Sequence, residues 1–257
     1  MGFDVGRFRA ESRERKPELG RPLMYQPVTG STNDDALLAA RSGAPHGSVF
    51  LADEQRAGRG RRGHTWLAAP GESLLFSVLL RPKLELSQTS ALTLAIGLAL
   101  RDAIAPLIAA VPELKWPNDL LVNQKKLAGV LVESQLQGDQ LQAVIVGVGL
   151  NVATREFTEE IAATATSLAL LGAAHLERER LLFELLEAIA ARVSAYQTAG
   201  ISGILAELNA VDALHGKRVR VEGTTGVGRG LDDQGRLLVE DEQKKIHAVL
   251  SGTVELL

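Results

Sequence analysis

The chain has 257 residues, of which 46% are hydrophobic and 23% are charged, and its formal net charge is −3. This length suits one large domain with a small second one, and the composition is that of an ordinary globular protein. The charge balance argues against a generally basic nucleic-acid binder, so we expect no nucleic-acid partner. The chain has no cysteine, which excludes disulfides, zinc–thiolate sites and a cysteine nucleophile, and suits a reducing cytoplasm.

The N-terminal residues 1–20 mix Arg, Lys and Glu with few large apolar side chains. We predict that they form a mobile or loosely docked arm, without the apolar core of a signal peptide. The most apolar stretch, residues 84–110, is interrupted by charged residues and a proline (Glu85, Arg101, Asp102, Pro106). It therefore predicts a buried helix, and we expect no membrane span.

Hydrophobic periodicity then predicts mixed helices and strands. Ser31 and Asp34 resemble a capping box that opens a helix ending at Gly43. Further helices are predicted at about 89–110, 178–199 and 201–213, and strands at 48–54, 73–81, 120–122, 128–137 and 141–152, the last three forming an antiparallel meander. Past Gly216, short alternating strands between Gly- and Asp-rich turns predict a small barrel. The fold class is α+β, with a main domain at 21–214 and a second at 215–257.

A glycine–arginine loop, GRGRRG at residues 58–63, matches the dinucleotide-binding pattern G-x-G-x-x-G. That fingerprint requires a helix directly after the loop, whereas here the chain runs through Pro70 and Gly71 into another predicted strand. No P-loop sequence is present. The glycines and guanidinium groups suit a mobile loop that closes over phosphate or carboxylate oxygens, although a solvated basic turn has the same composition.

Three further stretches carry candidate chemistry. The first, KWPND at 115–119, places Asn and Asp oxygens after a rigid proline and could hold a nucleotide and Mg²⁺, or could be an Asx turn beside a partly buried tryptophan. Lys125 and Lys126 at a strand start could balance charge on an acyl phosphate or simply be solvated. The glycines of GVGLN at 147–151 indicate close ligand approach or a bulge.

Taken in order and spacing, these stretches resemble the biotin–protein ligase family. The matching elements are STN (31–33), Gln55 with GRGRRGHTW (58–66), KWPNDL (115–120), KLAGV (126–130), GVGLN (147–151) and VGRGLDDQGRLLVE (227–240). The resemblance covers roughly residues 22–257. It implies a class II synthetase-like catalytic domain, with a mixed sheet flanked by helices, and an SH3-like C-terminal barrel.

The resemblance also implies a two-step reaction. The carboxylate of biotin, the substrate, would attack the α-phosphate of Mg-ATP to give biotinyl-5′-AMP, and a lysine of a biotin carboxyl carrier domain would then take the biotinyl group. Cationic side chains would offset the repulsion between the carboxylate and the polyphosphate. The loop would act as a lid that keeps water from the adenylate.

Site residues are carried over by position. The resemblance assigns Arg61, Lys126 and Asp119 to catalysis, with Asp119 as the Mg²⁺ ligand. Biotin binding is assigned to Ser31, Thr32, Gln55, Gly58, Arg59, Arg61, Lys126, Gly129 and Gly147, and nucleotide binding to Trp66, Asn118 and Asn151. Trp116 is a weaker candidate that could belong to the core.

Two departures from the family pattern stand out. His64 occupies a slot that is commonly basic, and histidine is only partly charged near neutral pH. The segment before residue 22 is too short for the N-terminal DNA-binding domain of bifunctional members, so a ligase-only enzyme is expected. A homodimer through a sheet edge near residues 141–150 would also fit the family. Rival functions are a lipoate–protein ligase and a biotin sensor without transferase activity.

Overall fold

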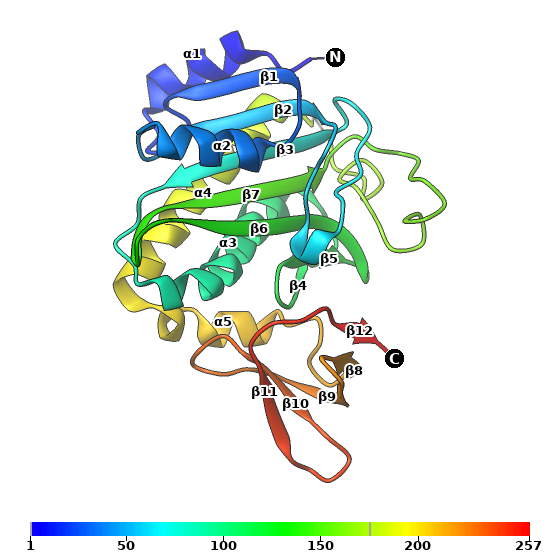
Figure 1. The fold of residues 1–257 in the computed structure, drawn as a ribbon. Coiled ribbons are helices and arrows are strands. Elements are labelled where there is room, and N and C mark those ends of the chain that lie inside the picture. The colour runs from blue at the N-terminus through cyan, green and yellow to red at the C-terminus, as the bar shows by residue number, and fades with distance from the viewer. Residues whose placement is uncertain (1, 175) are drawn as a thin grey trace.

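A computed structural model describes residues 2–174 and 176–257 as two β-sheets with helices packed around the larger one (Figure 1). The main sheet contains β1 (Leu23–Thr29), β2 (Val49–Gln55), β3 (Ser73–Leu80), β4 (Glu113–Lys115), β5 (Asp119–Val122), β6 (Lys125–Gln137) and β7 (Gln140–Asn151). The helices are α1 (Val5–Arg15), α2 (Thr32–Arg41), α3 (Thr89–Ile104), α4 (Arg178–Ala199) and α5 (Leu205–Ala210).

The main sheet has the strand order β1-β2-β3-β7-β6-β5-β4. Its β1–β2 pair is parallel and the other pairs are antiparallel, so the sheet is mixed, as predicted. The predicted meander is confirmed, because β5, β6 and β7 are consecutive antiparallel neighbours. The sequence patterns did not predict two of the strands, β1 and β4.

Alternate side chains of β3 and β7 point to opposite faces of the main sheet and pack into two separate apolar layers. Phe76 and Val146 belong to the large core, while Leu79 and Ile145 belong to a small one beneath α2. Figure 1 shows α2 in front of the sheet, with α3 and α4 behind it. Since α2 is short, part of the front face over β5, β6 and β7 is left for the glycine–arginine loop, and the site lies there.

The first helix boundary differs in one detail from the capping-box prediction. Ser31 is the N-cap of α2, but its side chain makes no capping hydrogen bond. Asp34 instead forms an ion pair with Arg59 of the glycine–arginine loop, with 2.8 Å between Oδ1 and Nη2. The helix ends before Gly43, which has a φ of 81° and therefore suits glycine.

The apolar segment forms a helix of the core. The segment Leu86–Leu107 is long and apolar enough to cross a membrane by length and composition alone, yet 61% of its 18-residue apolar window is buried inside the protein. The regular helix α3 ends at Ile104, and a short 3-10 turn containing Pro106 follows, so the predicted extension to residue 110 is wrong. The predicted helix at 201–213 is likewise shorter, a 3-10 turn followed by α5.

The prediction of a mobile or loosely docked arm is wrong for the described residues before 20. Val5–Arg15 form α1, and the Phe8 side chain is fully buried, with its ring centroid 6.3 Å from that of Phe183 on α4. Arg15 forms ion pairs with Glu184 and Glu187 of α4. The error has a physical cause: a few well-buried apolar side chains, here Phe3, Phe8 and Leu19, can dock a polar segment, and a count of apolar residues misses this.

The second sheet has five antiparallel strands, ordered β11-β10-β9-β8-β12. They are β8 (Arg218–Val221), β9 (Thr224–Leu231), β10 (Leu237–Glu240), β11 (Ile246–Val249) and β12 (Glu255–Leu256). Alternate side chains such as Val219, Val221, Leu237 and Val239 are buried. The predicted small SH3-like C-terminal unit is confirmed.

The predicted dimer edge near residues 141–150 is covered over most of its length by β3. From Val144 to Leu150, β7 pairs with β3 on one side and with β6 on the other. Where β7 extends beyond β3, the carbonyl of Gln142 accepts a hydrogen bond from Arg81. A homodimer through this segment therefore stays a prediction.

Candidate active site

A cavity of about 680 Å³ lies on the front face of the main sheet, beside the N-terminus of α2. Of the residues predicted for the site, all but one line it: Ser31, Thr32, Gln55, Arg59, Arg61, Trp66, Asn118, Asp119, Lys126, Gly129, Gly147 and Asn151. The exception is Gly58. These residues are up to 120 positions apart in sequence, so the fold gathers them into one place.

The sheet register explains the floor of the cavity. Residues Leu75, Gly149, Gly129, Asp119 and Lys115 are successive partners across β3, β7, β6, β5 and β4. Partners in an antiparallel sheet point to the same face. The two adjacent glycines therefore leave a gap in the side-chain layer, and the two charged residues stand beside that gap.

Protein side chains occupy the space above these glycines. A Cβ at Gly149 would lie 2.5 Å from Cε2 of Trp66, and one at Gly129 would lie 3.0 Å from Cζ3 of the same ring. A Cβ at Gly147 would lie 2.2 Å from Oδ1 of Asn33. In this structure Gly129 and Gly147 leave room for Trp66 and Asn33, and both also line the cavity, so their assignment to biotin binding stays a prediction.

The glycine–arginine loop is a hairpin-like excursion that starts near the end of β2. Gly60 donates a hydrogen bond to the carbonyl of His64 at 2.7 Å, and Trp66 donates one to the carbonyl of Gly58 at 3.0 Å. A Cβ at Gly58 would lie 2.8 Å from the oxygen of Trp66, so this glycine permits the close return of the chain. It is buried and serves the loop backbone, which is why it does not line the cavity.

No dinucleotide fold surrounds this loop. After a three-residue 3-10 turn at Arg61–Gly63, the chain is extended and enters β3. The helix that a dinucleotide fingerprint needs is absent from this described stretch, which confirms that the G-x-G-x-x-G match is coincidental.

The three loop arginines have different partners. Arg59 contacts Asp34 and Glu133, and Arg62 forms an ion pair with Glu222 of the second sheet. The backbone carbonyl of Arg61 accepts a hydrogen bond from the N–H of His64, but its guanidinium lines the cavity and has no hydrogen-bond or ion-pair partner among the described residues. Burial, and secondly the like charge of Arg62, lower the pKa of Arg61, although nearby Asp119 opposes this. Arg61 remains a cation that has no protein anion bound to it.

Two lysines flank the single carboxylate at the floor. Nζ of Lys126 lies 2.7 Å from Oδ1 of Asp119, although that oxygen has no hydrogen bond of good geometry. The same Nζ lies 5.4 Å from the centroid of the Trp66 ring, within cation–π range. Burial and the charge of Lys126 lower the pKa of Lys115, against the pull of Asp119. Three cations, Arg61, Lys115 and Lys126, therefore lie around one carboxylate, a field that favours an anionic ligand.

The other end of the cavity is neutral and hydrogen-bonding. The backbone N–H of Thr32 donates to Oε1 of Gln55 at 2.8 Å, and Oγ1 of Thr32 lies 3.1 Å from the same oxygen. Ser31 and Thr32 are only 2% and 4% exposed, so few positions remain from which a ligand could reach them. Directed polar groups of this kind, deep in a pocket, are suited to orienting a small polar ring.

The side-chain amides of Asn118 and Asn151, which were predicted to bind the nucleotide, donate hydrogen bonds to main-chain carbonyls in this structure. Nδ2 of Asn118 donates to the carbonyl of Val130, and Nδ2 of Asn151 donates to that of Thr166, both at 3.0 Å. Their Oδ1 atoms keep acceptor capacity. Trp116 is only 4% exposed and donates from its indole N–H to the carbonyl of Gly235, so it ties the second sheet to the main domain while it contributes to the cavity wall.

Several wall residues were missed by sequence reasoning. Asn33, Lys115 and Gly149 lie within the candidate stretches but were given no role, and the residues outside those stretches are Glu160, Ile161, Thr164, Ala165, and Gly252–Val254 before β12. Strand alternation could have found Gly149, because it lies two residues after Gly147 and must share its face. Among the residues that the structure describes, no three His, Cys, Asp or Glu side chains form a group able to hold a metal ion.

Two family models match the chain. The biotin/lipoate A/B protein ligase family matches residues 25–151, and the biotin protein ligase C-terminal domain matches residues 214–257. The second match coincides with the five-stranded sheet.

Relatives and solved structures extend the match to most of the chain. A biotin–[acetyl-CoA-carboxylase] ligase from Mycobacterium tuberculosis is 41% identical, over 86% of this chain and 84% of its own length. The bifunctional ligase/repressor BirA of Bacillus spizizenii is 35% identical, over 93% and 75%. The structure titled biotin protein ligase from Aquifex aeolicus in complex with biotin and ATP has a TM-score of 0.78 and 31% identity, over 91% and 98%. With this identity over most of both sequences, and with both of its domains matched, the chain belongs to the biotin protein ligase family.

Proposed function

We propose that this protein activates biotin with ATP and transfers it to a lysine of a biotin carboxyl carrier domain. In the first step a carboxylate oxygen of biotin bonds to the α-phosphorus of ATP, and the bond to the leaving pyrophosphate breaks. In the second, the neutral ε-amine of the carrier lysine bonds to the carbonyl carbon of biotinyl-5′-AMP and AMP leaves. The amine releases a proton as the amide forms.

The observation that carries this proposal is the unpaired Arg61 beside Lys115 and Lys126, in a family whose relatives are named for biotin ligation. A carboxylate and a polyphosphate repel each other strongly in a low-dielectric pocket. Arg61 and Lys126 would offset that repulsion and would stabilise the charge that develops on the phosphoryl oxygens. Lys115 adds a third positive charge.

The neutral end would take the biotin ring system. Thr32 and Gln55, with Ser31 beside them, offer donors and acceptors for a cyclic urea, and Arg59 and Arg61 would lie along the chain that leads to the carboxylate. Trp66 would pack beside the adenine, and Asn118 and Asn151 would lie near the nucleotide. Gly129 and Gly147 would keep the floor low enough for these groups, and Gly58 would shape the loop.

Magnesium is the metal that ATP chemistry implies. Mg²⁺ is usually held by one or two carboxylates together with substrate phosphates, and the donor set here, Asp119 with Asn118 next to it, fits such a site when Lys126 shifts toward the ligand. When bound, the ion would neutralise phosphate charge. Asp119 would then exchange its lysine partner for the metal.

The assay uses the whole chain with biotin, Mg-ATP and a biotin carboxyl carrier domain. We expect mass spectrometry to show a carrier that is heavier by one biotinyl group, and ATP–pyrophosphate exchange to depend on biotin. Exchange with lipoate alone would overturn the substrate assignment. Biotin binding without exchange or labelling would instead identify a sensor. The absence of cysteine favours a cytoplasmic location, which a fluorescent fusion would test.

A further inference from the structure

Glu133 is an acidic residue on β6 that no step above uses. By strand alternation it points to the front face of the sheet, four residues after Gly129. It lines a second cavity of about 620 Å³ on the other side of the glycine–arginine loop, together with Arg59, Gly60 and Arg61. Its side chain is 25% exposed, so water only partly screens its contacts.

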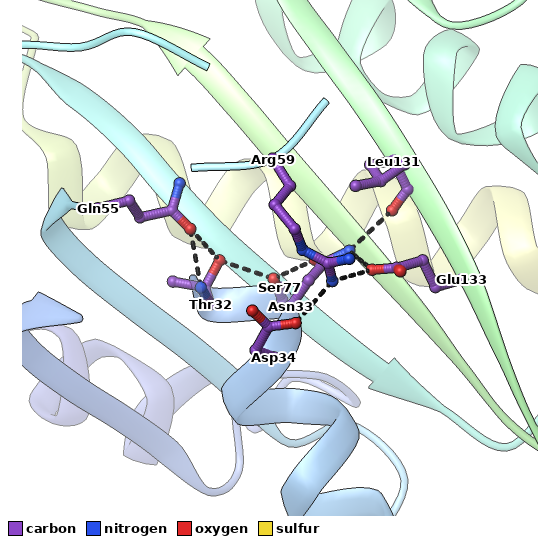
Figure 2. A network of polar contacts seen from close by, with 8 residues as sticks. All are labelled: Thr32, Asn33, Asp34, Gln55, Arg59, Ser77, Leu131 and Glu133. Atoms are coloured by element: carbon purple, nitrogen blue, oxygen red, sulfur yellow. Dashed lines mark hydrogen bonds and ion pairs between the residues drawn. The ribbon is translucent and has the colours of Figure 1, made fainter. Parts of the chain in front are cut away.

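One carboxylate oxygen of Glu133 joins two parts of the site. Its Oε2 accepts from Nη2 of Arg59 at 2.6 Å and from Nδ2 of Asn33 at 2.7 Å (Figure 2). Arg59 belongs to the loop, and Asn33 belongs to the first turn of α2. The same guanidinium nitrogen also lies 2.8 Å from Asp34. The loop is therefore fastened to the sheet and to the helix at one point.

The carboxylate of Glu133 also sets the orientation of the Asn33 side-chain amide. An ionised carboxylate only accepts hydrogen bonds, so the NH₂ group of Asn33 must face Glu133. Its Oδ1 then faces Ser77, whose hydroxyl lies 2.6 Å from it and 2.7 Å from Oγ1 of Thr32. Figure 2 shows this chain of contacts running from Arg59 through Glu133, Asn33 and Ser77 to Thr32 and Gln55.

We propose that Glu133 is a positioning residue of the ligase. Its carboxylate holds Arg59 of the glycine–arginine loop and orients Asn33, so that closure of the loop depends on the same contacts that order the biotin-binding end of the cavity. This role rests on the proposed function, since it concerns the same site. Glu133 acts through Arg59 and Asn33 and touches neither substrate.

The test compares Glu133→Ala with Glu222→Gln, which removes the charge of the carboxylate paired with Arg62 of this loop. Glu222 holds Arg62, on the second sheet, and contacts neither Asn33 nor α2. Charge-assisted hydrogen bonds of this type correspond to about a tenfold change in an equilibrium constant. We expect Glu133→Ala to raise the KM for biotin about tenfold in pyrophosphate exchange, with the KM for ATP within twofold. Glu222→Gln should leave both within twofold.

A double-mutant cycle separates positioning from general destabilisation. If Glu133 works through the loop arginine, Glu133→Ala should have a much smaller effect in an Arg59→Ala background than in the wild type. Hydrogen exchange at residues 58–66 with biotin bound should be faster in Glu133→Ala than in Glu222→Gln. Should Glu133→Ala not fold, Glu133→Gln, which keeps an acceptor for Asn33, replaces it with the same readouts.

The outcomes are separable. Lack of biotin-dependent exchange in the wild type would overturn the function itself. An active wild type with equal KM values for biotin in the two Glu variants, or with additive effects in the cycle, would overturn the role of Glu133 alone. Unequal loss of thermal stability without a change in the KM for biotin would also overturn it.

Discussion

The substitution Gly147→Ala tests whether the glycines of β7 serve the protein or the ligand. The added Cβ would lie 2.2 Å from Oδ1 of Asn33, whereas ordinary contact starts near 3.4 Å, so that oxygen would have to move by about 1.2 Å. Asn33 has little freedom to move, because Ser77 and Glu133 hold its two ends at 2.6 and 2.7 Å. Breaking one neutral and one charge-assisted hydrogen bond costs about 2–4 kcal/mol. The substitution of glycine by alanine in a strand also stabilises the folded protein by roughly 0.5–1 kcal/mol, which offsets part of this cost.

We therefore expect Gly147→Ala to lower the free energy of unfolding by about 1–3.5 kcal/mol, which urea denaturation measures. The control is Gly30→Ala, because nothing lies within 4 Å of its Cβ position and its φ is outside the left-handed region. That variant should be as stable as the wild type or slightly more stable. Calorimetry should show that Gly147→Ala also weakens biotin binding, since Asn33 orders the neighbouring Thr32. Equal stability of the two variants with wild-type biotin affinity would refute the reasoning.

Three further predictions concern single side chains. Arg61→Ala should lower the rate of pyrophosphate exchange about a hundredfold. Its free energy of unfolding should stay within about 0.5 kcal/mol of the wild type, because the Arg61 side chain has no hydrogen-bond or ion-pair partner among the described residues. A matching loss of stability would show that Arg61 is structural. Phe8→Ala should destabilise the protein by about 3–5 kcal/mol in urea denaturation, because the ring is fully buried against Phe183. A change below about 1 kcal/mol would mean that α1 packs only loosely on α4. Burial raises the pKa of Asp212 above its ordinary value of 3.8, so its contribution to stability is present below that value and is lost as the pH rises through the folded-state pKa. Asp212→Asn should therefore gain stability relative to the wild type as the pH rises from about 4 to 7, and a pH-independent difference would contradict this.

Local patterns predicted the parts of the fold that depend on nearby residues. Apolar runs located β3, β6 and β7 within a few residues, and their short turns correctly indicated a meander. The extended chain after Gly63 correctly excluded a dinucleotide site. Helix ends were less predictable: Pro106 ends the regular part of α3 early, and a helix pattern alone did not weigh that residue enough.

Contacts between distant segments were beyond the reach of sequence patterns. Asn33 and Glu133 are 100 residues apart, and their contact depends on the register between β6 and β7 and on the position of α2. Neither residue type suggests such a pairing by itself. The docking of α1 has the same origin, because Phe8 becomes a core residue only when α4 lies opposite it. Residue composition describes one segment at a time and carries no information about its partner.

The glycines at the cavity floor show that one sequence signal can have two causes. Sequence reasoning took them to mark close approach of a ligand, and they do border the cavity. The atoms nearest to them belong to Trp66 and Asn33, however, so their first effect is to let an indole lie against the sheet. Nε1 of Trp66 is buried there with no hydrogen-bond partner among the described residues. An unmet indole N–H costs about 1–3 kcal/mol, so a ligand that offers an acceptor, or that moves the ring, would recover this energy. The position of Trp66 over the glycines at the cavity floor thus links the stability of the protein to the binding of its substrate.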